Sequence, residues 1–249
     1  MTEPTPAAET APASSGVPFV TDAGRVVRVL FSPTAVFQEQ QSRPTWFLPW
    51  LVIAVMVVLV GLTTLPYTYR MMELGLAARG GAGQELPAAV RTFAKVMSLI
   101  AAPIVFLIFS LLAAGVMWVT LMLTGAKVRY RGLLCAAMFA SVTRVILIGL
   151  TSVVLRLRGT PAEAIRNLQD ARVSLGVDLL LPSDAAVSTF LRMVLGEIGP
   201  VQVWGLIITA TGIMVLEKQD KGSAWTAAMV SFVVGLLIAG LFGGLQGAG

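Results

Sequence analysis

The sequence predicts an all-α, polytopic membrane protein with five transmembrane helices and interfacial amphipathic helices. Apolar residues make up 56% of the 249 residues, and charged residues make up only 12%. A soluble domain typically carries about 25% charged residues, so this composition argues against one large soluble core. The apolar residues also gather into five long runs, each near the roughly 20 residues that cross a bilayer.

Each of the five runs is predicted to be one transmembrane helix. Trp46 and Trp50 open the first run, where an aromatic belt is expected at the membrane surface. The fourth run opens on a Gly-Pro pair, which leaves its start poorly defined. The predicted spans are Trp46–Leu65, Met97–Thr124, Gly132–Leu155, Ile198–Leu216 and Ala224–Phe242.

The chain before the first span divides into two parts. Residues 1–18 hold four prolines and no basic residue, which predicts a disordered tail. In residues 19–45, Ser32 and Pro33 predict the N-cap and first position of a short helix. This segment is interpreted either as an interfacial segment on the bilayer surface or as a plain juxtamembrane linker.

The long connection 156–197 also carries helix signals. A capping box of Thr160 and Glu163 predicts a helix that runs to about Leu175. An apolar stripe at helical spacing predicts an amphipathic helix over 184–195. This second helix is expected to lie on the membrane or cap the bundle, and a ligand-binding loop is the alternative.

The spacing of the Lys and Arg residues in the loops indicates how the chain is oriented in the membrane. With the N-terminus inside, inner and outer segments carry eight and nine Lys or Arg residues, so totals do not decide. The two tight loops "GAKVRYR" and "EKQDKG" concentrate positive charge, and short loops dominate the positive-inside rule. We therefore expect a cytoplasmic N-terminus and an external C-terminus.

The sequence predicts no enzyme, no cofactor and no metal site. It has no histidine and one cysteine, Cys135, which excludes His-based triads and intrachain disulfides. No P-loop, GxSxG, HExxH or CxxC motif is present. The basic residues form no patch interleaved with aromatics, so nucleic acid is not an expected partner. The expected partners are the lipid bilayer and other membrane proteins, with the oligomeric state open.

Arg144 is the candidate intramembrane site, because it lies inside the third apolar run about twelve residues from either end. A side chain cannot easily reach water from there, so Arg144 is expected to face the bundle interior or a water-filled cavity. It either ties helices together or binds an anionic headgroup or a partner's acid. Glu197 is judged too shallow to pair with it. The expected acceptors are Gln202, Thr209, Ser110 and the Leu99 carbonyl that Pro103 frees.

The fifth span carries a stripe of small residues that predicts close helix packing. The partner helix belongs either to the same chain or to another copy. Pro103, inside the second span, predicts a kink. The stripe consists of Ser231, Gly235, Ala239 and Gly243.

Three stretches resemble the Yip1-domain integral membrane proteins, in their bacterial branch. They are "VLFSPTAVFQEQQSRPTWFLPWLV", "TGAKVRYRGLLCAAMFASVTRVI" and "LGEIGPVQVWGLIITATGIMVLEKQDKGSAW", and the similarity spans roughly residues 27–243. The resemblance implies a Yip1-like domain over 46–243 with five spans and a cytoplasmic N-terminus. Eukaryotic members are associated with vesicle traffic and small Rab-type GTPases. Because Arg144 stands where relatives often have proline, no functional residue is carried over.

Two functions follow as hypotheses. The first is a non-enzymatic membrane scaffold or interaction protein in membrane organisation or trafficking, located in a bacterial inner membrane. The second is a small transporter or channel component that uses Arg144 in the bundle interior. The sequence shows no convincing internal repeat of the kind that transporters often carry, which favours the first.

Overall fold

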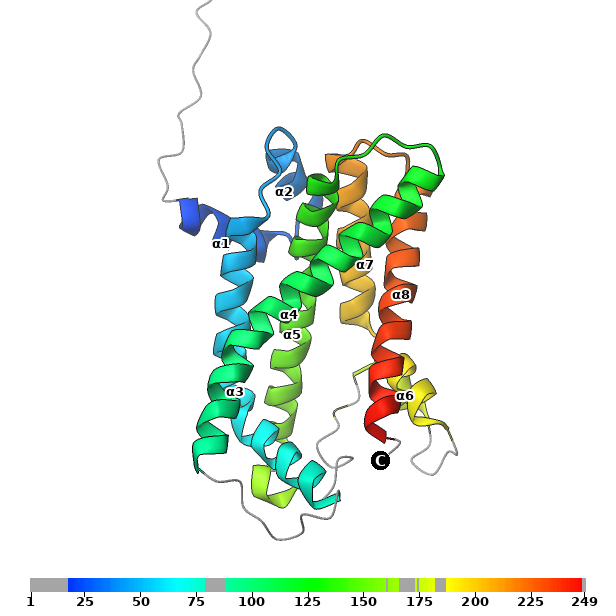
Figure 1. Ribbon diagram of the computed structural model, residues 1–249. Coiled ribbons are helices and arrows are strands. Elements are labelled where there is room, and N and C mark those ends of the chain that lie inside the picture. The colour runs from blue at the N-terminus through cyan, green and yellow to red at the C-terminus, as the bar shows by residue number, and fades with distance from the viewer. Residues whose placement is uncertain are drawn as a thin grey trace, which may run out of the picture.

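The computed structural model describes residues 18–78, 88–159, 161–165, 173, 175–181 and 187–247. Within these residues all regular structure is helical, and the long helices stand side by side in one bundle (Figure 1). The helices are α1 (Pro18–Arg28), α2 (Pro33–Gln40), α3 (Phe47–Ala78), α4 (Ala88–Leu123), α5 (Tyr130–Leu157), α6 (Thr189–Gly196), α7 (Pro200–Leu216) and α8 (Lys221–Gly247), with short 3-10 turns at Ala162–Ala164 and Val177–Leu180.

Four helices are long and apolar enough to cross a membrane, namely α3, α4, α5 and α8. Helices α6 and α7 meet at a break with a bend of 65°, and together they form a broken span or a re-entrant loop. The prediction of a polytopic all-α membrane protein is confirmed, with four or five spans. The fourth predicted span, Ile198–Leu216, corresponds to α7, which begins at Pro200 and has 17 residues, and the bend lies just before it. Proline fits the first position of a helix, where its missing N–H is not needed.

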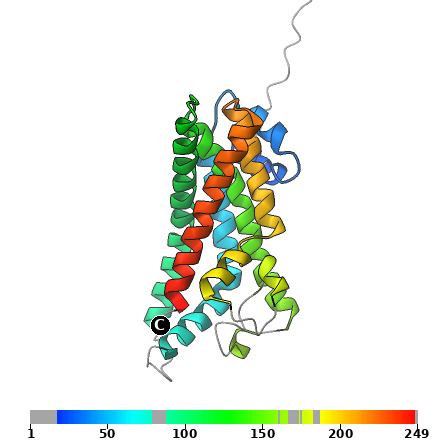
Figure 2. The same ribbon diagram turned by 90° about the vertical axis from the view of Figure 1, so that its right-hand side faces the viewer.

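The central helix of the bundle is α5. Its most apolar window is 56% buried, against at most 33% for the other three spans. It packs on α3, α4 and α7, and Figure 2 shows it behind α8 in the turned view. Small side chains such as Cys135 and Ala136 are fully buried along it and permit this close approach.

The segment before the first span is folded onto the bundle. Val26, Val29, Val36 and Phe37 have no exposed surface and belong to the core. The ring of Phe37 meets Phe139 of α5 edge to face, with the ring centroids 5.7 Å apart. The buried apolar side chains of this segment are thus covered by protein. Contact of its exposed side with the bilayer surface stays a prediction. The predicted disordered tail lies outside the described residues except for Pro18, which begins α1.

The helix predicted from Thr160 to Leu175 is wrong where the structure describes it. Only Ala162–Ala164 forms a turn of 3-10 helix, and the backbone is extended at Ile165. The buried side chain of Ile165 and the bond from Arg70 Nε to the Ile165 carbonyl, 2.8 Å, oppose continuation of a helix. Thr160 and residues 166–172 lie outside the described residues. The second predicted helix exists as α6 and ends at Gly196 as expected, but it begins only at Thr189, because Val187 and Ser188 are not helical.

One end of the bundle carries two short loops that are tied together. The Glu217 carboxylate, after α7, accepts the backbone N–H of Arg129 at the start of α5 through Oε2 at 2.7 Å. Arg129 Nη2 in turn donates to the Leu216 carbonyl at 3.1 Å. A Cβ at Gly132 would lie 1.8 Å from Glu217 Oε1, so the absence of a side chain there makes room for Glu217. The α4–α5 and α7–α8 loops are therefore fixed to each other.

Candidate functional site

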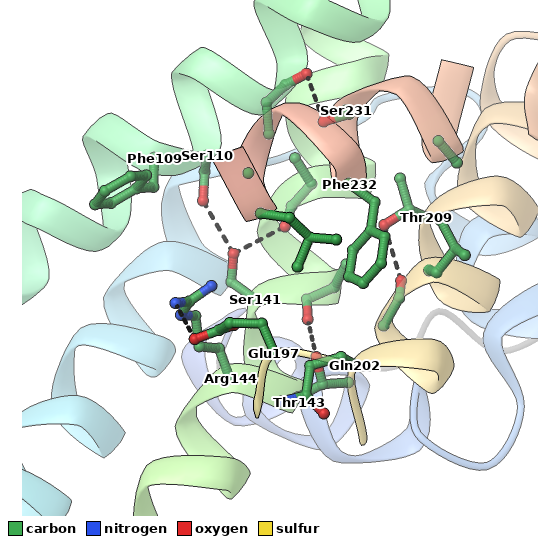
Figure 3. Close-up of a pocket in the computed structure, with 18 of the residues that line it drawn as sticks. Phe109, Ser110, Ser141, Thr143, Arg144, Glu197, Gln202, Thr209, Ser231 and Phe232 are labelled. Carbon is green, nitrogen blue, oxygen red and sulfur yellow. Dashed lines mark hydrogen bonds and ion pairs between the residues drawn. The ribbon is translucent and has the colours of Figure 1, made fainter. Parts of the chain in front are cut away.

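A cavity of about 420 Å³ lies between α4, α5, α7 and α8. Helix α5 packs mainly on α3, α4 and α7, whereas α8 packs mainly on α4, α6 and α7. The cavity occupies the space that remains between α5 and α8 (Figure 3). Its wall is largely apolar, and its polar side chains are Ser110, Ser141, Thr143, Arg144, Glu197, Gln202, Thr209 and Ser231.

The four polar residues singled out from the sequence all line this one cavity. Arg144 projects from α5, Ser110 from α4, and Gln202 and Thr209 from α7. Figure 3 shows their side chains arranged around the same space. A functional role for these four residues stays a proposal, and it is based on their position around one cavity.

Arg144 forms an ion pair with Glu197, which the sequence had not assigned to it. Arg144 Nη2 donates to Glu197 Oε1 at 3.2 Å, and the side chains are 58% and 26% exposed. Glu197 lies in the turn between α6 and α7. The break between these helices places this turn beside α5, which is why a residue predicted to be too shallow reaches Arg144.

The depth of the ion pair follows from contacts at both ends of α5. At one end Arg131 Nε donates to the Pro44 carbonyl at 2.9 Å, just before α3 begins. At the other end Arg156 Nη2 donates to the Thr63 carbonyl at 3.0 Å. Arg144 lies roughly halfway between these two arginines in the sequence. The ion pair therefore lies within the bundle, between the two ends of α5.

The hydroxyl groups of the cavity do not bind Arg144. Ser110 and Ser141 link α4 to α5 through an Oγ–Oγ distance of 3.0 Å. Each of these hydroxyls also lies at 2.9 Å from a carbonyl of its own helix. Thr209 donates to the Gly205 carbonyl, also at 2.9 Å. These groups are satisfied locally, so the expected bonds from Arg144 to Ser110 and Thr209 are not present.

Gln202 lines the cavity with a buried amide group. Both its Nε2 and its Oε1 are buried and have no hydrogen-bond partner within the described part of the chain. An unsatisfied buried polar group typically costs about 1–3 kcal/mol. Only a rotation of the side chain would offer its donor group and its acceptor to a molecule in the cavity.

The small-residue stripe of α8 is divided between packing and the cavity. Ser231 Oγ donates to the Ala113 carbonyl of α4 at 3.4 Å. A Cβ at Gly235 would meet nothing within 4 Å, so Gly235 is exposed and lines the cavity without close packing. The close approach on α8 is at Gly240, where a Cβ would lie 2.6 Å from Phe190 of α6. Ala239 is half-buried, and the surroundings of Gly243 lie outside the described residues. A packing role for the whole stripe stays a prediction.

Pro103 lies inside α4, which continues as one helix on both sides of it. Its carbonyl accepts the indole N–H of Trp50 at 3.2 Å and so joins α4 to α3. Leu99 lines a separate apolar cavity of about 180 Å³ between α3, α4 and α5. The Leu99 carbonyl is thus not part of the Arg144 site. No cluster of three or more potential metal ligands occurs among the described residues.

The comparisons with known proteins agree with the resemblance seen in the sequence. The family model of the Yip1 domain matches residues 27–243. The chain belongs to the Yip1 domain family. The match begins inside α1 and ends inside α8, so the Yip1 domain includes every span and the whole cavity. Yip1 proteins are non-catalytic membrane proteins, and this one is a multi-pass integral membrane protein. Comparison with curated proteins finds no match, and comparison with solved structures finds none either.

Proposed function

We propose that this Yip1 protein is a non-enzymatic membrane scaffold or interaction protein that acts in membrane organisation or trafficking. The family match over residues 27–243 is the observation that carries this proposal. We further propose a bacterial inner membrane as its location, with the N-terminus in the cytoplasm. The two tied loops, which hold most of the densely spaced basic residues, support this orientation.

The surface proposed for protein contacts is the loop end of the bundle, defined as residues 23–43, 124–129 and 217–220. These segments come from distant parts of the sequence and gather at one end of the molecule (Figure 1). Phe31 is 81% exposed there, whereas Val29 and Val36 on either side of it in the sequence are buried in the core. An exposed aromatic side chain on a firmly held segment is typical of a contact site.

Site-specific photo-crosslinking in native membranes tests this surface. A photoreactive residue at Phe31 should capture one or a few defined proteins. The same residue at Leu157, which is equally exposed at the opposite end of α5, is the matched control and should capture none of them. If both positions capture the same proteins, or neither captures a protein, the loop end is not the contact surface.

A second candidate function is a small transporter or channel component, and one observation favours it. The Arg144–Glu197 pair lies in a cavity inside the bundle, at a break between two helices. Transporters often bind their substrates at broken helices. Purified protein in liposomes should then carry ions or small polar solutes, and the Arg144→Leu variant should not. If none of a broad panel of solutes is carried, the transporter function is excluded and the scaffold function remains.

A further inference from the structure

We propose that the cavity between α4, α5, α7 and α8 binds one zwitterionic phospholipid. The phosphate of its headgroup contacts Arg144, its ammonium group contacts Glu197, and part of one acyl chain lies along the apolar wall of α4 and α8. This ligand site goes beyond the scaffold role and does not depend on which protein partners the chain has.

The adjacent positive and negative charges of Arg144 and Glu197 favour a ligand that carries both charges. Arg144 and Glu197 share a single hydrogen bond of 3.2 Å, and the Arg144 side chain is 58% exposed. A guanidinium group has five N–H donors and binds phosphate oxygens well, so most of this capacity is open to a ligand. An anion alone would have to displace the Glu197 carboxylate and leave it unpaired inside the bundle, which is costly. A headgroup with both charges gives each side chain a partner.

Gln202 adds a second polar contact beside the ion pair. Its amide group is buried without a hydrogen-bond partner among the described residues and belongs to the cavity wall. After a rotation of the side chain toward the cavity, the amide N–H₂ can donate to an ester or phosphate oxygen, or the amide oxygen can accept from the ammonium group. Ligand binding would therefore satisfy a group that the described protein leaves unsatisfied.

The opening of the cavity indicates that the ligand comes from the bilayer. Val105 and Phe109 on α4 line the cavity and are 43% and 47% exposed, and Gly235 on α8 is exposed without a side chain. These residues belong to membrane-spanning helices, so the surface they share faces lipid. Along α5 the lining runs from Ala137 to Leu147, which is about 15 Å of helix. A volume of about 420 Å³ is within the usual range of about 300–1,000 Å³ for small-molecule sites.

Gly235→Leu is the variant that tests the site with least risk to the fold. A Cβ at Gly235 meets nothing within 4 Å, so the leucine extends into the cavity without a clash. Gly115→Leu in α4 is the matched control, because Gly115 also has open space beside it and does not line the cavity. The measurement is native mass spectrometry of the purified protein after exchange into micelles with added phosphatidylethanolamine. We expect one retained lipid in the wild type and in Gly115→Leu, and at least a tenfold loss of retention in Gly235→Leu.

The headgroup assignment is tested with the double variant Arg144→Gln/Glu197→Gln, which removes both charges but keeps hydrogen-bonding groups. We expect the wild type to retain phosphatidylethanolamine in preference to phosphatidylglycerol and diacylglycerol, and the double variant to lose this preference. Equal retention in Gly235→Leu and the wild type would overturn the site. Equal retention of all three lipids by the wild type would overturn the headgroup assignment. Stabilisation by soluble glycerophosphoethanolamine as strong as that by the lipid would show a polar-solute site in its place.

Discussion

At the residue scale, removal of the Arg144 side chain would leave the Glu197 carboxylate without its ion-pair partner. Glu197 has no other ion-pair partner among the described residues, and it lies only 26% exposed in the turn between α6 and α7. A carboxylate that loses its cation inside the bundle is more costly than two neutral side chains in the same place. The single and the double substitution should therefore differ.

We expect Arg144→Leu to lower the free energy of unfolding by about 2 kcal/mol, the scale of a lost hydrogen bond to a charged group. The double variant Arg144→Leu/Glu197→Gln should recover part of this loss. Thermal unfolding of the wild type, Arg144→Leu, Glu197→Gln and the double variant in one detergent gives the coupling between the two sites. If Arg144→Leu unfolds at the wild-type temperature, the ion pair does not stabilise the fold.

Sequence reasoning found the site of Arg144 but not its partner. A cation in an apolar run must lie in the interior or a cavity, and the small polar residues of neighbouring spans follow from their positions in those spans. The depth of Glu197 does not follow, because it depends on the bend between α6 and α7. The sequence also predicted that the Ser110 and Thr209 hydroxyls would bind Arg144. They bond to carbonyls of their own helices, which a hydroxyl group in a helix can always do.

Glu217 is a second residue with a defined structural task. Its carboxylate accepts the Arg129 N–H at the start of α5, where an anion is also favoured by the helix dipole. Its side chain is only 3% exposed. No motif in the sequence distinguishes it from other loop carboxylates, because its partner is a backbone group far along the chain.

We expect Glu217→Ala to lower the free energy of unfolding by about 1–3 kcal/mol, because a buried N–H loses its acceptor. Glu217→Gln keeps an acceptor oxygen and should cost less. Chemical or thermal unfolding in detergent measures both, with Glu163→Ala on the exposed 3-10 turn as a control near zero. An equal cost for Ala and Gln would assign the effect to charge and not to the hydrogen bond.

At the scale of elements, α1 and α2 are joined by charge as well as by core packing. Glu39 of α2 pairs with Arg28 and with Arg25, the latter at 3.2 Å. The hydrogen bond from Arg28 lowers the pKa of the Glu39 carboxyl below its ordinary value, Arg25 adds to this effect, and partial burial opposes it. A carboxyl with a lowered pKa stabilises the fold above its unfolded-state pKa and loses this contribution as pH falls through its folded-state pKa.

We expect Glu39→Gln to be less stable than the wild type near pH 7, by about 0.2–1 kcal/mol for such a solvent-accessible pair. The difference should shrink as the pH falls below 4.5, the ordinary pKa of this group, toward the lowered value. Parallel thermal unfolding of both proteins from pH 7 to pH 3 measures it. A difference that does not change with pH would mean that Glu39 acts through packing alone.

Helix α8 allows a direct comparison of two glycines. A Cβ at Gly240 would lie 2.6 Å from Phe190, whereas a Cβ at Gly235 meets open space. We expect Gly240→Leu to lower the free energy of unfolding by about 1–3 kcal/mol through overpacking, and Gly235→Leu to leave it nearly unchanged. Melting temperatures in detergent decide between the two glycines. The opposite order would show that Gly235 is close-packed, for example against a second copy.

The helices of the bundle could be predicted from the sequence, whereas the connection 156–197 could not. Long apolar runs leave few alternatives to helices in lipid, because every backbone group must be bonded internally. A capping box such as that at Thr160 and Glu163 only indicates where a helix can begin. The contact of Arg70 with the Ile165 carbonyl is a tertiary interaction, and it competes with that local preference.

For the whole molecule, the tied loops give the orientation a simple test. Ala126 lies in the α4–α5 loop and Gln219 in the α7–α8 loop at one end, and Gly159 follows α5 at the other end (Figure 1). Reporter fusions at Ala126 and Gln219 should read cytoplasmic, and a fusion at Gly159 should read external. The reverse pattern would invert the molecule and move the loop end to the outer face.

The bundle is also uneven in length around its circumference. Helix α4 has 36 residues and is about 54 Å long, while α7 has 17 residues and is about 25 Å long. Lipids beside α7 therefore meet a shorter straight helix than lipids beside α4, because α6 is bent away from α7 by 65°, and a bilayer adapts to a shorter hydrophobic segment by thinning beside it. A thinned region stores elastic energy, and two copies that share one region store less than two copies apart. We therefore expect the broken span to draw like-shaped proteins together through the lipid, without any direct contact between them.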